Sequence, residues 1–467
     1  MISRRAMFMT LGAVAVTGGA GAGYVGWRAR ETPEPPSPPE VDAQGRLLWR
    51  NWSGIQSSYP AERWAPATEE ELAAAIARRP LPVRVVGSGH SFMPLVPTVG
   101  TLMTLDGITG LIAHDTATHR ATFFAGTRLG DVGPALAAIG QEMPNLPDIN
   151  KQSIGGAIAT GTHGTGRNFK AIHGEVTGLR LITASGEIID CSAQVRPEVF
   201  HSARVGLGAF GVVTRVELQN RPLTRILKRT YVAQLEDAIA QWPELIAKHR
   251  NVEFYAVPFT GLAAVIACDE TDRPVQPRGP DTDAEGLMSL KQLRDLFGFS
   301  NRARRQMAQS AMANLPPEEA VDEGWKLLSN DRPIRFNEME FHLPLETQMQ
   351  ALREVMQAIE THRPDVFFPI EVRVIEADDA WLSPFFGRLS GSIAVHTWYK
   401  DEYQFLHELI EPILRRHGGR PHWGKLNTLK AMDFAALYPR WRDAMDVRRE
   451  LDPEGRFLND YLKTVLS

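Results

Sequence analysis

The chain has 467 residues, which is more than one ordinary hydrophobic core supports and predicts two folded domains. Its formal charge of -4 is nearly balanced, with 51 basic and 55 acidic residues. This balance argues against a general nucleic-acid-binding protein, because phosphate contacts need a large basic excess. The two cysteines, Cys191 and Cys268, are too few for a disulfide framework or a thiolate metal cluster. We therefore predict two buried or free thiols and no metal site.

The N-terminus has the features of an export signal. Arg4 and Arg5 precede an uncharged run over 6–27 that is rich in glycine and alanine. A twin-arginine pair before a weakly apolar stretch is typical of a Tat-type signal. We expect export through the Tat translocon to the periplasm, followed either by cleavage or by retention as a tether on the outer face of the cytoplasmic membrane. The Pro/Glu-rich stretch 32–39 is predicted to be a stiff spacer, so residues 1–44 lie outside the folded domains.

Residues 45–222 show strands mixed with helices, which predicts an α+β domain. Apolar patterning and end signals predict helices over 69–79 and 129–139, and strands over 83–86, 101–105, 121–125 and 211–218. The segments 179–183 and 187–190 are predicted to pair as a hairpin.

Two glycine-rich turns in this domain indicate an anion-binding site. The first is Gly87-Ser-Gly-His-Ser91, and the second runs from Ser153 to Gly166 as Ser-Ile-Gly-Gly-Ala-Ile-Ala-Thr-Gly-Thr-His-Gly-Thr-Gly. Glycines at positive φ let backbone N–H groups converge on an anion, and hydroxyl side chains add donors. The spacing after Gly89 does not fit the Rossmann fingerprint. The pair of turns instead suits a pyrophosphate.

Together the two turns resemble the FAD domain of the vanillyl-alcohol-oxidase-type (PCMH-type) flavoproteins. The resemblance includes Gly208-Ala-Phe-Gly-Val-Val213 and is closest to the sugar-1,4-lactone oxidase and alditol oxidase branch, over residues 52–462. In that family the histidine matching His90 is often bonded covalently to the flavin 8α-methyl carbon; a noncovalent histidine is the alternative. The resemblance implies that FAD is bound by Gly87, Ser88, Gly89, His90, Ser91, Asp148, Ser153, Gly156, Thr160, Gly161, Thr162, His163, Gly164, Thr165, Gly166 and Val213.

Residues 223–467 are predicted to form an α+β substrate (cap) domain whose C-terminal end returns to the FAD domain. We expect strands over 252–257, 338–343, 366–375 and 392–398, a helix over 345–361, helical segments within 289–314 and a surface loop over 273–286. The predicted fold class is thus a two-subdomain PCMH-type FAD-binding domain plus an α+β substrate domain.

Glu371 and Arg373 lie two residues apart in a predicted strand, so they share one face. That face could simply meet water. However, Arg420-Pro-His-Trp-Gly-Lys425 resembles the His-Trp-x-Lys signature of the lactone and alditol oxidases. The resemblance implies an active site of Glu371, Arg373, His396 and Lys425. Lys425 or Arg373 would stabilise the reduced flavin, the other would orient the substrate oxygen, and Glu371 or His396 would take the proton.

One departure affects the expected activity. Pro147 and Asp148 stand where the alditol oxidases and plant-type lactone dehydrogenases usually have Ala-Ser, a position that lies against the flavin and influences oxygen access. Asp148 could bind a substrate hydroxyl or cap its loop. The expected reaction is hydride transfer from a hydroxyl-bearing carbon of a sugar lactone or polyol to flavin N5, with oxygen as acceptor, as in a D-arabinono-1,4-lactone oxidase. A quinone- or cytochrome-linked dehydrogenase is the near alternative, and a noncatalytic flavin- or sugar-binding protein is the remote one.

Overall fold

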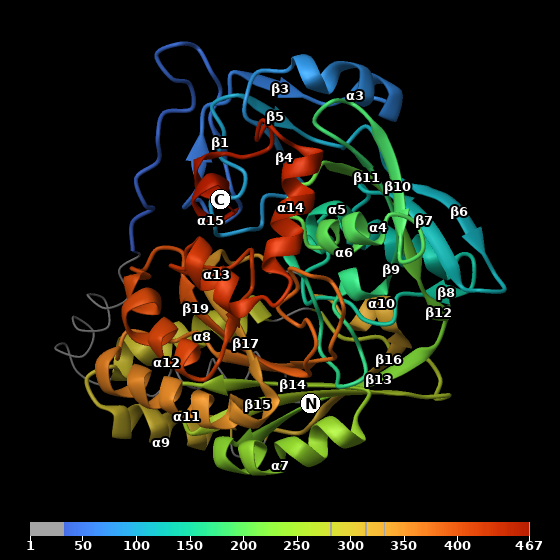
Figure 1. Ribbon diagram of the computed structural model, residues 1–467. Helices are drawn as coiled ribbons and strands as arrows, with labels where there is room; N and C mark the ends of the chain where they lie inside the picture. The colour runs from blue at the N-terminus through green and yellow to red at the C-terminus, as the bar shows by residue number, and fades with distance from the viewer. Residues whose placement is uncertain (1–31, 281–282, 313–314, 331, 467) are drawn as a thin grey trace.

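The computed structural model describes residues 32–280, 283–312, 315–330 and 332–466 (Figure 1). The predicted export signal lies outside these residues, among which no helix has the length and apolarity needed to cross a membrane. The spacer 32–39 has no helix or strand, as predicted. It lies along the folded body, where Glu34 pairs with Arg335 at 3.1 Å and with Lys400 at 3.0 Å.

The first domain contains two small sheets, seen in the upper half of Figure 1. One is parallel and has the order β3-β5-β4, and the other is antiparallel with the order β10-β9-β11-β7-β6. The short pairs β1-β2 and β8-β12 flank them. The strands are β1 (Trp49–Arg50), β2 (Ser57–Ser58), β3 (Glu62–Trp64), β4 (Val83–Val85), β5 (Thr101–Met103), β6 (Leu111–Asp115), β7 (Arg120–Phe124), β8 (Gln141–Glu142), β9 (Val176–Ile182), β10 (Ile188–Ser192), β11 (Val212–Gln219) and β12 (Arg221–Pro222).

The helices of this domain are α3 (Glu69–Ala75), α4 (Leu129–Ala137), α5 (Ile154–Thr160) and α6 (Pro197–Ala203). Helix α3 begins at Thr68, whose Oγ1 accepts a hydrogen bond from the Glu71 N–H. Three glutamates in its first turn interact favourably with the positive end of the helix dipole. The predicted helices, strands and hairpin of this domain are confirmed, with ends shifted by a few residues. Strand β6 and helix α6 were not predicted.

The second glycine-rich segment is only partly a turn, so the prediction of a turn over its whole length is wrong. Helix α5 begins at a serine cap, with Ser153 Oγ accepting the Gly156 N–H at 3.4 Å. It ends at Gly161, which has the left-handed φ of 80° that favours glycine. Gly155 packs so closely on Ala125 that a Cβ atom there would lie 3.1 Å from the alanine methyl. Glycine therefore serves close packing of this helix as well as turn formation.

The second domain is built on one eight-stranded antiparallel sheet with the order β16-β13-β15-β14-β18-β19-β17-β20. Helices α7 and α11 cover one face of it, below the sheet in Figure 1. Its strands are β13 (Arg225–Gln234), β14 (Asn251–Val257), β15 (Leu262–Glu270), β16 (Glu318–Glu323), β17 (Phe336–Pro344), β18 (Ile370–Ile375), β19 (Ser390–Trp398) and β20 (Arg420–Pro421). Its helices are α7 (Leu235–Lys248), α8 (Asp283–Phe297), α9 (Asn301–Met312), α10 (Gly324–Leu327), α11 (Leu345–His362), α12 (Glu411–Arg416), α13 (Ala431–Leu437), α14 (Trp441–Leu451) and α15 (Asp460–Leu466).

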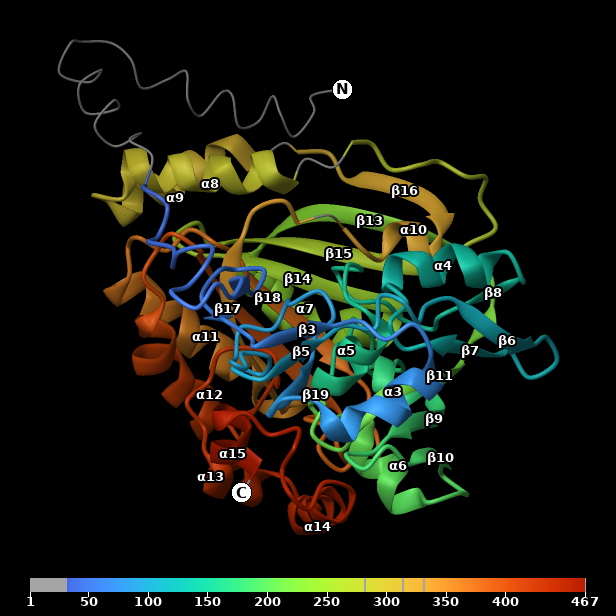
Figure 2. The same cartoon turned by 90° about the horizontal axis from the view of Figure 1, so that it is seen from above.

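Several predictions for this half need correction. The predicted loop 273–286 ends early, because α8 begins at Asp283, where its acidic first turn suits a helix N-terminus. The predicted strand 366–375 begins only at Ile370, just after Pro369, which supplies no N–H donor to the ladder. Strands β13, β15 and β16 and helix α7 were not predicted. Figure 2 shows α8 and α9 as one layer at an edge of the molecule, opposite α14.

Strand β18 lies inside the sheet, and all six of its residues are buried. The prediction that Glu371 and Arg373 share a face is confirmed, but that face does not meet water: their exposed fractions are 5% and 6%. Cys191 and Cys268 are buried free thiols, as predicted. The apolar face of the sheet packs on the helices, so the polar face is turned toward the first domain.

The C-terminal segment runs back to the first domain, as predicted. The Val83 N–H donates to the Arg456 carbonyl at 2.9 Å, and Asn459 Nδ2 donates to the carbonyls of Pro94 and Pro97, both at 2.9 Å. Helix α14 packs against α6 of the first domain.

Candidate active site

One large cavity is lined by residues of both domains. The glycine-rich segments and β4 contribute one wall, and β17, β18 and β19 contribute another. All four predicted catalytic residues line it. Of the residues expected to hold FAD, the lining includes Gly87, Ser88, Gly89, His90, Ser91, Asp148, Ser153, Gly156, Thr160, Thr162, His163 and Val213.

Gly161, Gly164, Thr165 and Gly166 are not part of this lining. Gly161 ends α5, and a Cβ atom on Gly164 would collide with the Leu146 carbonyl. Thr165 is inserted between two strands of the large sheet: its hydroxyl donates to the Val252 carbonyl at 2.6 Å and accepts the Val374 N–H at 3.3 Å. This part of the segment joins the two domains.

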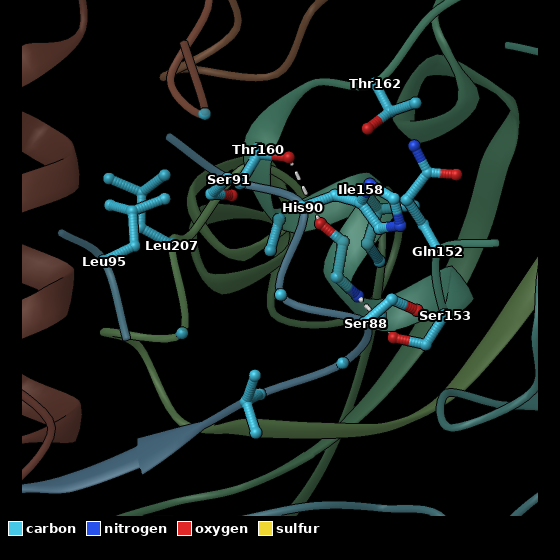
Figure 3. Close-up of a pocket in the computed structure, with 18 of the residues that line it drawn as sticks. Ser88, His90, Ser91, Leu95, Gln152, Ser153, Ile158, Thr160, Thr162 and Leu207 are labelled. Carbon is cyan, nitrogen blue, oxygen red and sulfur yellow. Dashed lines mark hydrogen bonds between the residues drawn. The ribbon is translucent and has the colours of Figure 1, made fainter. Parts of the chain in front are cut away.

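The two glycine-rich segments touch each other. A Cβ atom on Gly87 would collide with Ser153 Oγ, and Gly89 has a left-handed φ of 67°. Ser88 Oγ donates a hydrogen bond to the Lys151 carbonyl and accepts one from Arg128 Nη1 at 2.5 Å. Figure 3 shows Ser88 and Ser153 close together, with His90 and Ile158 beside them. Gly87 is therefore required by the close approach of the two segments, and Gly89 is favoured by its left-handed backbone conformation.

Arg84 is a cavity residue that the sequence analysis missed. Its guanidinium donates to the carbonyls of Leu95 at 2.8 Å, Leu207 at 2.7 Å and Phe457 at 2.5 Å. Burial lowers its pKa to about 9, against the opposing effect of Asp452. Arg84 thus joins three distant segments at the cavity wall, to which Leu95 and Leu207 contribute apolar side chains that lie side by side in Figure 3. A charged residue within the β-branched strand 83–86 was the signal that could have revealed it.

His90 lies in the cavity wall against an aromatic ring. Its imidazole stacks on Trp52 with ring centroids 5.1 Å apart. Burial, and then the nearby cations Lys425 and Arg128, lower the pKa of His90 to about 4. The imidazole is therefore neutral near pH 7, the form in which a ring nitrogen has a free lone pair.

Arg373 is held mainly by Glu340, a second residue that the sequence analysis missed. Its Nη2 lies 2.5 Å from Glu340 Oε1 but 3.4 Å from Glu371 Oε2. Burial alone would raise the pKa of Glu340, but Arg373 and then His163 hold it well below its usual range. Glu371 instead accepts a hydrogen bond from the Tyr255 hydroxyl at 2.9 Å.

Lys425 is paired with Glu338, also unpredicted, through a direct contact between Nζ and Oε2. Glu338 Oε1 lies 3.6 Å from His396 Nε2. His396 Nδ1 lies 3.2 Å from the Pro369 carbonyl, so we assign the Nδ1–H tautomer. In that tautomer Nε2 is the ring nitrogen that carries the lone pair. The alternation Glu338-x-Glu340-x-His342 was the sequence signal for this buried polar face.

A cluster of buried histidines surrounds Glu340. His163 Nε2 lies 3.1 Å from Glu340 Oε1, and burial holds the pKa values of His342 and His422 well below their usual range. Ligand atoms of His163, Glu340 and His342 come within 4.8 Å of one another, a spacing that a metal ion could bridge. The guanidinium of Arg373 contacts Glu340, and its positive charge repels a metal ion at this point.

The cavity fits FAD in its chemistry. The closely apposed glycine-rich segments offer backbone and hydroxyl donors for a pyrophosphate, Leu95 and Leu207 offer apolar surface for a ring system, and His90 is a neutral nucleophile. The polar face of the sheet supplies cations and carboxylates for the reacting end.

Comparison with known proteins agrees with this arrangement. The family model described as "D-arabinono-1,4-lactone oxidase" matches residues 216–465, and an "FAD binding domain" model matches residues 60–192. This chain belongs to the D-arabinono-1,4-lactone oxidase family. It is an FAD-dependent oxidoreductase, and its predicted fold class is confirmed.

Similar proteins cover nearly the whole chain. It is 33% identical over 431 residues to L-gulono-1,4-lactone dehydrogenase of Mycobacterium tuberculosis, covering 90% of this chain and 99% of the relative. It is 29% identical to L-gulonolactone oxidase of Bos taurus (90% and 98% covered) and 28% identical to alditol oxidase of a Streptomyces species (89% and 98%). Cholesterol oxidase from Brevibacterium sterolicum has the same fold, with a TM-score of 0.73, 16% identity and coverage of 94% and 100%.

Proposed function

We propose that this protein oxidises a hydroxyl-bearing carbon of a sugar lactone or polyol. The observation that carries the proposal is that Glu371, Arg373, His396 and Lys425 open onto the same cavity as the glycine-rich segments. Bound FAD supplies a two-electron acceptor that takes hydride at N5. The names of the similar proteins, two lactone enzymes and an alditol oxidase, support this substrate class.

The contacts of the three glutamates support distinct roles for the polar side chains. Glu340 fixes Arg373 and Glu338 fixes Lys425, so both cations are positioned before substrate arrives. Preorganised cations stabilise charge that develops on the reduced cofactor or on the substrate oxygen. Of these three glutamates Glu371 is the least engaged, and we assign proton acceptance to it, with His396 as the second candidate.

Oxygen is the proposed electron acceptor, with a quinone or cytochrome as the alternative. The relatives include both oxidases and dehydrogenases, so their names do not separate these cases. Asp148 is bound by Asn330 Nδ2 at 2.6 Å and by Arg332 Nε at 2.7 Å. This double contact favours a loop-fixing role for Asp148 over binding of a substrate hydroxyl.

Anaerobic flavin bleaching tests the function. Purified holoenzyme is mixed with sugar lactones, alditols and aldoses under nitrogen, and the flavin absorbance is followed. Bleaching by a lactone or an alditol is expected, whereas no bleaching by any of them, with dithionite still effective, favours the noncatalytic alternative. Peroxide formation in air against dye reduction under nitrogen then identifies the acceptor.

Two further features belong to this proposal. We infer a covalent bond between His90 and the flavin 8α carbon, supported by the neutral imidazole and its stacking on Trp52. We also infer Tat-dependent export to the periplasm, either free or tethered to the outer face of the membrane, on the basis of Arg4 and Arg5 in the sequence.

A further inference from the structure

A second, smaller cavity lies behind the proposed active site. It shares Arg373 and Asp148 with the large cavity and is otherwise lined by residues that include Lys228, Glu253 and Cys268. Its volume of about 20 Å³ is room for about one water molecule. Its far wall includes the half-buried Lys228 and Leu328. The cavity therefore connects the polar face of the sheet with the region beyond β14.

The cavity forms where two strands separate. Strands β14 and β18 pair from Ala256 opposite Ile370 to Phe254 opposite Val372, and there the ladder stops. Thr165 then occupies the space between Val252 and Val374, to which its hydroxyl is hydrogen-bonded. Glu253 is the next residue of β14 beyond the ladder and lines the opening. The inserted threonine thus creates the space into which Glu253 faces.

Glu253 is close to the assigned proton acceptor. Tyr255 pairs directly opposite Glu371, so Glu253, two residues earlier on the same face, is its diagonal neighbour. Diagonal neighbours in such a ladder have Cβ atoms about 7 Å apart, within reach of long side chains or of one bridging water.

Glu253 also has the chemistry of a relay group. In the part of the chain that the structure describes, its carboxyl group makes no hydrogen bond or ion pair, and its neighbours act on it only through burial and charge. The charged and titratable groups that face it are Glu371 and Arg373 on β18, Asp148 on its loop, Lys228 on β13, Cys268 on β15 and Tyr255 on its own strand. Burial and then Glu371 raise the pKa of Glu253 to about 8, so the group is a neutral acid near pH 7.

The proposed reaction requires a proton to leave this buried site. In that reaction the substrate carbon would give up a hydride, with its electron pair, to bound FAD, while the O–H bond breaks, a C=O bond forms and the proton passes to Glu371. We propose, on the basis of that function, that Glu253 relays this proton into the second cavity. Its carbonyl oxygen accepts the proton while its hydroxyl releases another to water. Glu253 therefore acts through Glu371, by passing its proton on, and does not touch the substrate.

Stopped-flow mixing of anaerobic holoenzyme with a lactone or alditol that bleaches it tests the relay, with flavin absorbance and a pH-indicator dye read together. Wild type should release its proton as the flavin is reduced. Glu253→Gln keeps the shape but cannot relay, so proton release should lag behind flavin reduction by about 100-fold. The control Cys268→Ala changes the same cavity without removing an acid and should behave as wild type. Proton release in step with reduction in Glu253→Gln would overturn the relay.

Two checks separate this inference from the proposed function. If no substrate bleaches wild type, the proposed function fails at the first step. The infrared spectrum of wild-type holoenzyme at neutral pH needs no substrate and no folded variant. It should contain a protonated carboxyl band that shifts in D₂O, and absence of this band would overturn the role of Glu253. If Glu253→Gln loses FAD, Glu253→Asp is used in its place. This variant keeps a carboxyl group, so it should release the proton faster than a variant of Glu253 that has no carboxyl group.

Discussion

Arg373 lies closer to Glu340, at 2.5 Å, than to Glu371, at 3.4 Å, although Glu371 is its neighbour in sequence. The contact with Glu340, which lies on β17, fixes the position of the Arg373 guanidinium. It leaves Glu371 with one hydroxyl donor, Tyr255, and only a loose cationic contact. A carboxylate in a tight pair with arginine is a weak base, because the charged form is favoured. Glu340 therefore keeps Arg373 out of a tight pair with Glu371.

Replacing Glu340 with glutamine should transfer Arg373 to Glu371. We expect the rate constant of anaerobic flavin reduction to fall about 100-fold, since a misplaced group costs this much at an active site. Ser392→Ala is the matched control, because Ser392 donates a neutral hydrogen bond to the same oxygen of Glu340. It should reduce the rate far less. Wild-type reduction kinetics in Glu340→Gln would contradict a positioning role.

The flavin should remain attached to the protein after acid precipitation. His90 is neutral and held against Trp52, so its nitrogen is free to bond to the cofactor. His90→Ala should bind FAD in the native state and release it into the supernatant on denaturation. A colourless wild-type pellet with free FAD would disprove the covalent bond and leave the noncovalent site standing.

Stability should decline in mild acid because of the buried histidines. The pKa of His342 is held below its usual value of about 6.5, so the unfolded chain binds a proton that the folded chain does not. The stability that comes from keeping His342 neutral is fully present above the pKa of histidine in the unfolded chain. As pH falls below that pKa, the free energy of unfolding decreases by about 1.4 kcal/mol per pH unit for each such histidine. Urea unfolding between pH 7.5 and 5 should show a shallower decline for His342→Gln than for wild type. Equal slopes would rule out this contribution.

Replacing Arg4 and Arg5 with lysine should retain the protein in the cytoplasm. Lysine keeps the charge but removes the twin-arginine pair that distinguishes a Tat signal from other basic N-termini. Cell fractionation with flavin fluorescence as the readout measures the outcome. Unchanged recovery from the periplasm or the membrane fraction would exclude the Tat route.

The sequence predicted the parts of the fold that have local signals. Alternating apolar residues located β17, β18 and β19, and the glycine pairs located the segments that touch at Gly87 and Ser153. Strands β13 and β15 were missed because both are long strands with mixed exposure and lack a clear alternation. Helix α5 was missed because its glycines suggested a turn, whereas here they allow close packing.

Only the site residues that belong to sequence motifs could be predicted. Glu371, Arg373, His396 and Lys425 were found by pattern and resemblance, and they line one cavity. Their partners Glu338 and Glu340 come from another strand, β17, which only the sheet order brings beside them. The position of Thr165 between two strands likewise depends on tertiary structure. A sequence therefore reveals charged candidates more readily than the ion pairs that hold them.

Lys425 tests whether the redox chemistry takes place at this polar face. A fixed cation contributes more to the transition state than to the ground state, because negative charge grows as the cofactor is reduced. Lys425→Met keeps most of the side-chain length and removes the charge. FAD content should stay near normal, since the cofactor is proposed to be held by the glycine-rich segments. Lys463→Met is the control, because Lys463 is exposed on α15 and lies outside the cavity.

The most direct measurement is the rate constant of anaerobic flavin reduction at saturating substrate in wild type, Lys425→Met and Lys463→Met. We predict a fall of about 100- to 1000-fold for Lys425→Met, the loss typical of removing one charge-stabilising group, and no change for Lys463→Met. A Lys425→Met enzyme whose retained flavin is reduced at the wild-type rate would contradict the assignment of the chemistry to this face.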